Sequence, residues 1–342
     1  MLKKSLILSL LAMILMSCGS KEQAVLNVYN WSDYIDPAVL TEFENEFQVK
    51  LVYDTFASNE ELLAKLQGGA AGYDVVVPSG YMVAIMIGEN LLSPIDTSQI
   101  PNLKGLDPNF LNPPYDPKSQ YSVPFAYGTS GLGYNYDEIG EELDSWGALW
   151  DPRFKGRILL LDDMREVFGL AYKYLGYSVN DTDPAHLEEA KQLLMDQKTN
   201  LLKYESAMNK DLLLTREALI SHHWAGDIYQ LIDEDSSFAF TIPKEGATLF
   251  TDCMTIPAAA PHKELAHKFI NFILRPEITG RIVNKIWYAM PYPDALQYVD
   301  EEISSDPNIF PPDEILSRCE FIADLGDFTK DMDRAWTELK MK

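Results

Sequence analysis

The sequence predicts an α/β protein that begins with parallel strands and the helices connecting them. Short apolar runs alternate with segments of helical periodicity between residues 25 and 77, the pattern of a mostly parallel sheet flanked by helices. A second alternation of the same kind begins near residue 157. The chain of 342 residues is also long enough for two domains of ordinary size. We therefore expect two α/β units.

The first predicted strands are the apolar runs at residues 25–29, 51–56 and 73–77. The last run contains consecutive valines, which is typical of a strand buried on both faces of a parallel sheet. A helix is expected between each pair of runs. Strand, helix, strand, helix and strand in this order predict a sheet whose neighbouring strands run parallel.

Local signals mark where the connecting helices begin. Asp36 and Pro37 supply an N-cap and a first-turn proline, and apolar residues follow at helical spacing. Ser58 and Glu61 have the spacing of a capping box for the second helix, which glycines 68, 69 and 72 end. Both helices are therefore predicted from capping as well as from periodicity.

The remainder of the chain contains a long connection and a second α/β set. Residues 93–124 are rich in proline, aspartate and asparagine and predict a surface excursion. Residues 128–136 are a glycine-spaced segment that suits a strand crossing between the domains. Further strands are expected at residues 157–161, 219–224 and 238–242, and further helices at residues 166–176, 183–195 and 262–274.

The N-terminus has the features of a secretory signal. Lys3 and Lys4 precede an apolar run at residues 6–16 that is too short to span a bilayer permanently. Cys18 follows directly, and LMSC at residues 15–18 resembles a bacterial lipobox, although Met16 replaces the usual small residue. We predict a signal peptide over residues 1–17 and acylation of Cys18, which tethers the protein to a membrane. The alternative is an ordinary signal peptide with an incidental cysteine.

Composition narrows the possible partners. The net charge of −24 disfavours nucleic acid and anionic lipid surfaces and weakly favours cationic solutes. His222 and His223 are neighbours without metal-like spacing to other ligands, so we expect no metal site and no cofactor. Cys253 and Cys319 are far apart in sequence and are predicted to be separate buried thiols.

Candidate ligand-binding residues lie where predicted strands end. Open α/β sheets bind ligands beyond the carboxyl ends of their strands. Residues 30–34, 78–81 and 162–166 occupy such positions, as do Trp224 beyond another strand and Asp252 beyond Phe250. These segments combine aromatic and acidic side chains. Carboxylates neutralise ammonium groups and aromatic faces attract them, so the combination predicts an organic cation as ligand.

Each of these residues also has a simpler interpretation. Trp31 and Tyr34 are equally suited to packing between domains, and Asp33 to capping a helix. Asp163 is close enough in sequence to form a solvated ion pair with Arg165, the one basic residue of these segments. A tryptophan such as Trp224 is more often part of a core. The prediction of a cation site therefore depends on the residues as a set.

At these same segments the chain resembles the bacterial periplasmic spermidine/putrescine-binding proteins, over nearly its whole mature length. The matching stretches are YNWSDY at 29–34, VVPSGY at 76–81, SWGALW at 145–150, DDMREVF at 162–168 and INFILRP at 270–276. The resemblance implies a type II periplasmic-binding-protein fold with two lobes, each a mixed sheet flanked by helices, and the ligand in the cleft between them. The implied lobes are residues 24–128 plus 252–296 and residues 132–247 plus 302–342.

The resemblance also implies roles for individual residues. Asp33, Asp163, Glu166 and Asp252 match the carboxylates that bind amines, and Ser32 and Ser206 match lesser contacts. The side chains expected to cradle the polyamine are Trp31, Tyr34, Ser79, Tyr81, Trp224 and Tyr288.

Phe250 replaces a tryptophan of the spermidine-preferring members, and Ile322 falls where those members use a glutamine. Because isoleucine cannot hydrogen-bond an aminopropyl end, we expect putrescine to bind at least as tightly as spermidine. The family likeness further implies that the cleft closes on its ligand and that permease subunits of an ABC importer receive it. The sequence leaves the oligomeric state open, and we expect a monomer by default.

Rival functions lack matching residues. Gly128 to Gly133 does not have the spacing of a nucleophile elbow, and the sequence contains neither a phosphate-binding loop nor an H-E-x-x-H motif. Asp163 and Glu166 could mimic a glycosidase pair only at a defined separation. A binder of another small organic cation and a surface adhesin that retains the fold remain open alternatives, because fold does not fix function.

Overall fold

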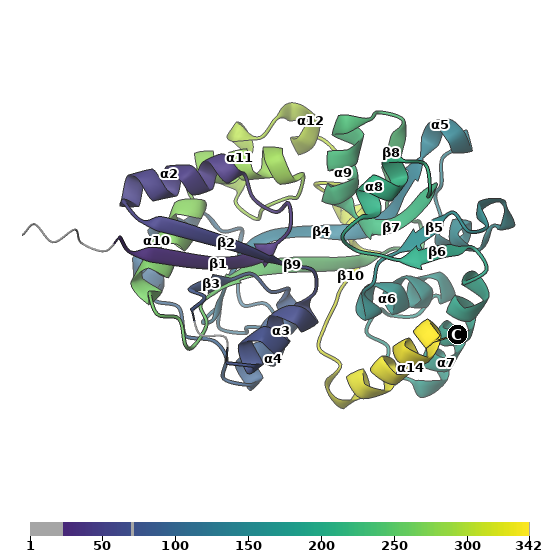
Figure 1. Ribbon diagram of the computed structural model, residues 1–342, viewed down its shortest axis with the longest axis horizontal. Coiled ribbons are helices and arrows are strands. Elements are labelled where there is room, and N and C mark those ends of the chain that lie inside the picture. Colours follow the sequence, from purple (N-terminus) through teal and green to yellow (C-terminus); the bar gives the residue numbers. More distant parts are fainter. Residues whose placement is uncertain (1–22, 70–71, 342) are drawn as a thin grey trace, which may run out of the picture.

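The computed structural model describes residues 23–69 and 72–341, so the predicted signal peptide and Cys18 lie outside the described residues. In the described part, a 10-stranded sheet runs through the molecule in the order β2-β1-β3-β9-β4-β7-β5-β6, with β10 beside β9 and β8 beside β4 (Figure 1). The strands are β1 Val25–Trp31, β2 Lys50–Phe56, β3 Val75–Val76, β4 Ser122–Asn135, β5 Ile158–Leu160, β6 Leu201–Tyr204, β7 Ile220–Trp224, β8 Phe238–Thr241, β9 Thr248–Thr255 and β10 Glu320–Phe321.

Helices cover the sheet in two groups, which define the two lobes. The N-terminal lobe combines β1, β2 and β3 with α2 Pro37–Phe47, α3 Asn59–Gln67, α4 Gly80–Gly88, α10 Lys263–Ile273 and α11 Pro276–Ile286 (Figure 1). The C-terminal lobe combines β5 to β8 with α6 Met164–Leu175, α7 Pro184–Gln197, α8 Asn209–Leu214, α9 Ala225–Glu234 and α14 Thr329–Met341. Short helices are α5 Tyr136–Ile139, α12 Glu301–Ser304 and α13 Asp313–Leu316. The predicted α/β class and two-lobed fold are confirmed, whereas the residue boundaries of the lobes stay a prediction.

The beginning of the chain folds as its capping signals predict. β1 pairs in parallel with both β2 and β3. The Asp36 carboxylate accepts a hydrogen bond from the backbone N–H of Ala38 at 2.9 Å, and the Ser58 hydroxyl accepts one from Glu61 N–H at 3.1 Å. The Glu61 carboxylate reaches back to the N–H of Ala57 rather than to Ser58. Satisfied N–H groups fix where α2 and α3 begin, and hence where β1 and β2 end.

The C-terminal third returns to the N-terminal lobe through α10. The apolar face of this helix buries Ala266, Phe269 and Ile270. The Phe269 ring contacts that of Phe43 on α2 at a centroid distance of 5.2 Å. The apolar residues whose helical spacing predicted α10 therefore pack against a segment more than 200 residues away in sequence. Cys253 and Cys319 are buried and not disulfide-bonded, as predicted.

The predicted surface excursion at residues 93–124 is only partly correct. Ile100 and Leu106 are buried in the main core, and the segment ends inside the sheet, since β4 starts at Ser122. Asp116 is also buried, where its carboxylate accepts hydrogen bonds from the backbone N–H groups of residues 120, 121 and 122. Asp116 is thus a polar residue that organises a loop from the inside, so a polar composition did not by itself indicate exposure.

Two long antiparallel strands connect the lobes. β4 pairs with β9 from Ser122 to Thr129, and from Ser130 onward it pairs with β7 and β8 of the C-terminal lobe. Because these strands are continuous across the boundary, residues on β9 lie at the bottom of the space between the lobes. The prediction that the segment at residues 128–136 crosses between the domains is confirmed, although the strand starts six residues earlier than expected.

Candidate functional site

A pocket opens between the two lobes, above β9. Every residue predicted to bind ligand lines it: Trp31, Ser32, Asp33, Tyr34, Ser79, Tyr81, Asp163, Glu166, Ser206, Trp224, Phe250, Asp252, Tyr288 and also Ile322. Trp31 ends β1, Trp224 ends β7, and Asp163 with Glu166 begins α6 after β5, so the carboxyl ends of strands do supply the site. Asp252 is an exception, because it lies within β9 and not in a loop after a strand.

Asp252 is the buried carboxylate at the base of the pocket, with only 4% of its surface exposed. It accepts hydrogen bonds from the Ser79 hydroxyl at 2.6 Å and from the Tyr34 hydroxyl at 2.8 Å. Asn59 in turn donates to the Ser79 hydroxyl at 3.1 Å. Burial raises the pKa of Asp252 to about 7, against the lowering effect of these two hydrogen bonds. A cation arriving here would restore the ionised form.

Asp163 and Glu166 form an acidic pair on the C-terminal lobe. Asp163 caps α6 by accepting from the N–H groups of Arg165 and Glu166 at 2.8 and 3.0 Å. Burial, followed by the charges of Glu60 and Glu166, raises the pKa of Asp163 to about 7. Glu166 accepts from Trp224 Nε1 at 3.2 Å and from the Thr248 hydroxyl at 2.5 Å. Burial opposes its ionisation, but interactions with His222 and these donors lower the pKa of Glu166 overall.

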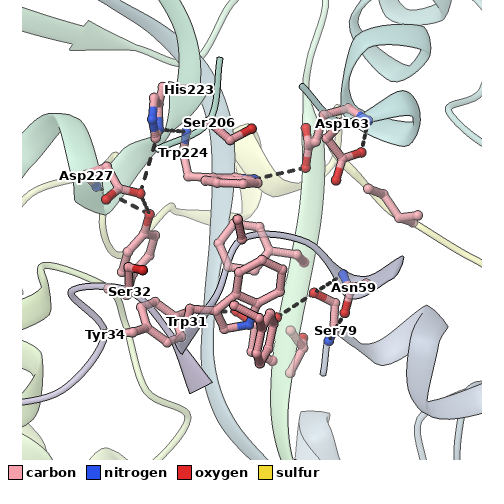
Figure 2. A pocket seen from close by; sticks show the side chains of 18 of the residues that line it. Trp31, Ser32, Tyr34, Asn59, Ser79, Asp163, Ser206, His223, Trp224 and Asp227 are labelled. Carbon is pink, nitrogen blue, oxygen red and sulfur yellow. Dashed lines mark hydrogen bonds and ion pairs between the residues drawn. The ribbon is translucent and has the colours of Figure 1, made fainter. Parts of the chain in front are cut away.

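The alternative interpretation of Asp163 and Arg165 as a solvated ion pair is wrong. Arg165 is buried, and its guanidinium donates to the Ala323 carbonyl at 2.6 Å and to the Asn180 side-chain oxygen at 2.9 Å. The basic residue thus fastens the C-terminal segment to the back of α6. The Asp163 carboxylate is left facing the pocket (Figure 2).

Aromatic rings from both lobes form the walls. Trp31 and Trp224 approach edge to face with centroids 6.1 Å apart, and they lie between Asp163 on one side of the pocket and Asp227 on the other (Figure 2). Trp31 is held by a hydrogen bond from Nε1 to the Val77 carbonyl at 2.9 Å. Tyr288 packs edge to face with Tyr34 at 5.1 Å and with Phe250 at 5.8 Å. Rings fixed in this way present apolar faces and π-electron density to a ligand.

Asp33 does not cap a helix, which was its alternative interpretation. Asp36, not Asp33, caps α2. Asp33 instead has a left-handed backbone with φ of 52°, and its side chain is 68% exposed at the rim of the pocket. Its carboxylate lies 3.2 Å from Lys210 Nζ of the opposite lobe. A neighbouring cation therefore already partners the most exposed of the predicted carboxylates.

Sequence reasoning missed several lining residues, above all Asp227 and Lys210. Asp227 accepts a hydrogen bond from the Tyr288 hydroxyl at 2.8 Å across the cleft. Asp227 follows Trp224 by three residues. A search for polar residues after the strand that ends at Trp224 would have found it if it had extended one helical turn further. The approach is close because residue 226 is glycine, where a Cβ atom would lie 2.3 Å from the Tyr288 ring. Lys210 enters from α8, and no sequence pattern indicated it.

This arrangement suits capture of a cation and not covalent chemistry. The aromatic rings of the pocket present apolar faces on which methylene groups of a ligand can pack. The carboxylates that line the pocket are Asp33, Asp163, Glu166, Asp227 and Asp252. Fold and pocket together define a two-lobed solute-binding protein. The chain belongs to the bacterial extracellular solute-binding proteins, whose family pattern matches residues 38–311. Such proteins serve transporters and are not enzymes.

Individual relatives place the chain more narrowly. It is 35% identical over 332 residues to the spermidine/putrescine-binding periplasmic protein of Salmonella typhimurium, covering 96% of this chain and 95% of that one. It is 33% identical over 353 residues to the putrescine-binding periplasmic protein PotF of Escherichia coli, with the same coverage. The structure of the TpPotD lipoprotein of Treponema pallidum superimposes with a TM-score of 0.85 at 31% identity, covering 93% of this chain and all of that one. The predicted resemblance to spermidine/putrescine-binding proteins is confirmed.

Proposed function

We propose that this protein captures a polyamine outside the cytoplasm and delivers it to the permease subunits of an ABC importer. The observation that supports this most is the set of carboxylates and edge-to-face tryptophan rings gathered from both lobes into one pocket. The relatives named above are described as binding spermidine and putrescine, or putrescine. A polyamine has the matching chemistry, because ammonium groups alternate with methylene chains.

The expected energetics come from two kinds of contact. An ammonium 4 Å from a carboxylate gains about 4 kcal/mol at an effective dielectric constant near 20. Each methylene buried against Trp31, Trp224 or Phe250 adds about 0.8 kcal/mol, and each cation–π contact about 0.5–2 kcal/mol. Water weakens these charge interactions. The ligand therefore favours the closed state, in which the lobes exclude water from the pocket. Closure of the cleft on the ligand is therefore part of the proposal.

We expect putrescine to bind at least as tightly as spermidine. Phe250 and Ile322 both line the pocket, and neither offers a hydrogen-bond acceptor to an additional ammonium. The test is isothermal titration of the mature, unacylated protein with each polyamine, after unfolding and refolding to remove bound ligand. One-to-one binding with comparable constants, or with putrescine tighter, is the expected result.

Two outcomes of this titration would count against the proposal. A tenfold preference for spermidine would contradict the inference from Phe250 and Ile322 while leaving polyamine capture intact. No heat with either polyamine, from a sample whose circular dichroism shows a folded protein, would contradict polyamine capture itself. X-ray scattering of the same samples tests closure and the monomeric state, through a smaller radius of gyration with ligand and the mass of a single chain.

Anchoring through Cys18 is a further part of the proposal. Its support is the LMSC sequence at residues 15–18 and the description of the Treponema pallidum relative as a lipoprotein. Within residues 23–69 and 72–341, no helix has the length and apolar character needed to cross a membrane. We expect labelled palmitate to be incorporated into the wild-type protein and not into Cys18→Ala. Equal labelling of both proteins, or labelling of neither, would remove the anchor from the proposal.

A further inference from the structure

One lining residue has the chemistry of a ligand amine. Lys210, in the first turn of α8, extends its ammonium to the rim of the pocket, and it is the only lysine or arginine among the described lining residues. Its Nζ atom lies 3.2 Å from Asp33 of the N-terminal lobe and 3.8 Å from Asp227 of the C-terminal lobe. The ammonium thus sits between carboxylates of opposite lobes, as an end of a bound polyamine would.

A second contact fixes this position. Lys210 Nζ donates to the Gln230 side-chain oxygen at 3.0 Å, while the amide nitrogen of Gln230 donates to the Ile286 carbonyl at 3.1 Å. Gln230 is therefore oriented by α11, with its oxygen directed at the lysine. The lysine side chain is only 25% exposed. An ammonium with a carboxylate on either side and an oriented amide acceptor is held in place and does not extend freely into solvent.

We infer that Lys210 is a specificity-determining residue whose ammonium occupies one cation position of the cleft, and thereby disfavours polyamines that would place a further ammonium there. The inference rests on the proposed function. Asp227 and Asp163 lie on opposite sides of the two tryptophans (Figure 2). The Lys210 ammonium neutralises Asp33 and Asp227. The carboxylates that remain available to ligand ammonium groups are Asp252, Asp163 and Glu166. A diamine can use these, whereas the third ammonium of a triamine meets a fixed positive charge.

A different role for the same contacts predicts a different result. Because the Lys210–Asp33 pair bridges the lobes, the lysine could instead act as a latch that stabilises the closed state. Removing a latch weakens every ligand, since closure then becomes less favourable for all of them. Removing an occupant of a cation position strengthens the longer ligand selectively, because two carboxylates become free for its additional ammonium. The ratio of the affinities separates these roles.

The experiment is titration calorimetry of putrescine and spermidine with the wild-type protein and with Lys210→Met, which keeps the unbranched chain and removes the charge. We expect spermidine to bind about tenfold more tightly to the variant, and putrescine to change by less than about threefold. Lys210→Arg keeps the charge and should retain the wild-type ratio. Lys244→Met is the matched control, because it removes one positive charge from an exposed pair with Asp144 outside the pocket.

The possible outcomes are distinct. A wild-type protein that binds neither polyamine contradicts the proposed function, and this inference with it. A wild-type protein that binds a polyamine, with a ratio that Lys210→Met leaves unchanged or with both ligands weakened, overturns this inference alone. A similar shift in Lys244→Met would also overturn it, because the effect would then reflect overall charge. Should Lys210→Met fail to fold, judged by thermal unfolding, Lys210→Gln gives the same test with a polar side chain.

Discussion

Replacing Asp252 by asparagine is expected to weaken polyamine binding by about a hundredfold or more. Removing one partner of a desolvated, hydrogen-bonded charge pair costs about 2–5 kcal/mol. Asp252 meets these conditions because it is buried, belongs to the rigid crossing strand β9, and is oriented by Ser79 and Tyr34. A carboxylate positioned in this way needs no rearrangement to receive an ammonium. Titration calorimetry of the variant with putrescine at pH 8 measures the loss.

Two controls separate binding from folding in this experiment. Asp54→Asn removes an exposed carboxylate of the same lobe, on the outer strand β2, that accepts a hydrogen bond from the Tyr73 hydroxyl. This variant should bind polyamine as the wild type does. Thermal unfolding without ligand should show that Asp252→Asn is at least as stable as the wild type at pH 8, because the asparagine avoids burying a charge. Affinity within threefold of the wild type would show that Asp252 is not an amine-binding carboxylate.

Polyamine affinity is expected to fall steeply as the pH drops below 7. In the ligand-free protein the pKa values of Asp252 and Asp163 are raised to about 7, so both carry protons in mildly acidic solution. A bound ammonium favours the ionised carboxylates, and binding must then expel those protons. The affinity should therefore decrease about tenfold per pH unit for each proton expelled, below about pH 7. Calorimetry at pH 8 and at pH 5.5 measures the decrease.

Stability of the ligand-free protein should follow the opposite trend. The folded-state pKa of each aspartate lies above its ordinary value, so protonation favours the folded state. This contribution to stability is fully present below the ordinary aspartate pKa of about 4, declines above it, and is lost as the pH rises through about 7. Denaturant unfolding at pH 6 and pH 8 should show the loss, and Asp252→Asn should reduce it. Affinity that stays constant from pH 8 to pH 5.5, with the fold intact, would contradict the coupling of binding to proton release.

The early part of the fold is predictable from sequence because its signals are local. Asp36-Pro37 and Ser58 mark helix starts within one turn of chain, and the valines of β3 indicate burial on both faces. The insertion of β9 between β3 and β4 has no local signal. Its pairing partners, such as Val76 and Thr129, are far away in sequence, and the antiparallel register depends on the whole lobe being assembled. Long-range pairing is therefore what the sequence does not reveal.

The same distinction applies to the site. Trp31 is the last residue of β1, and Ser79 and Asp163 come shortly after the ends of β3 and β5. These three were predicted from position and residue type. Asp252 was predicted, but in the wrong setting, since it belongs to β9 itself. Lys210 could not be predicted, because its place beside Asp33 and Gln230 depends on how α8 packs against α9 and faces the other lobe. Contacts made across two lobes become visible only in three dimensions.

The path of β9 has a consequence for how the chain acquires its structure. The hydrogen bond from the Thr255 hydroxyl to the Val76 carbonyl closes a loop of 179 residues. Until β9 has been synthesised, the N-terminal lobe lacks the strand that joins β3 to β4, and its sheet has an open edge. Loop closure of this length is entropically costly and slow. We therefore expect the nascent chain to remain without a stable first lobe during most of its synthesis, and to fold only when its last third is present.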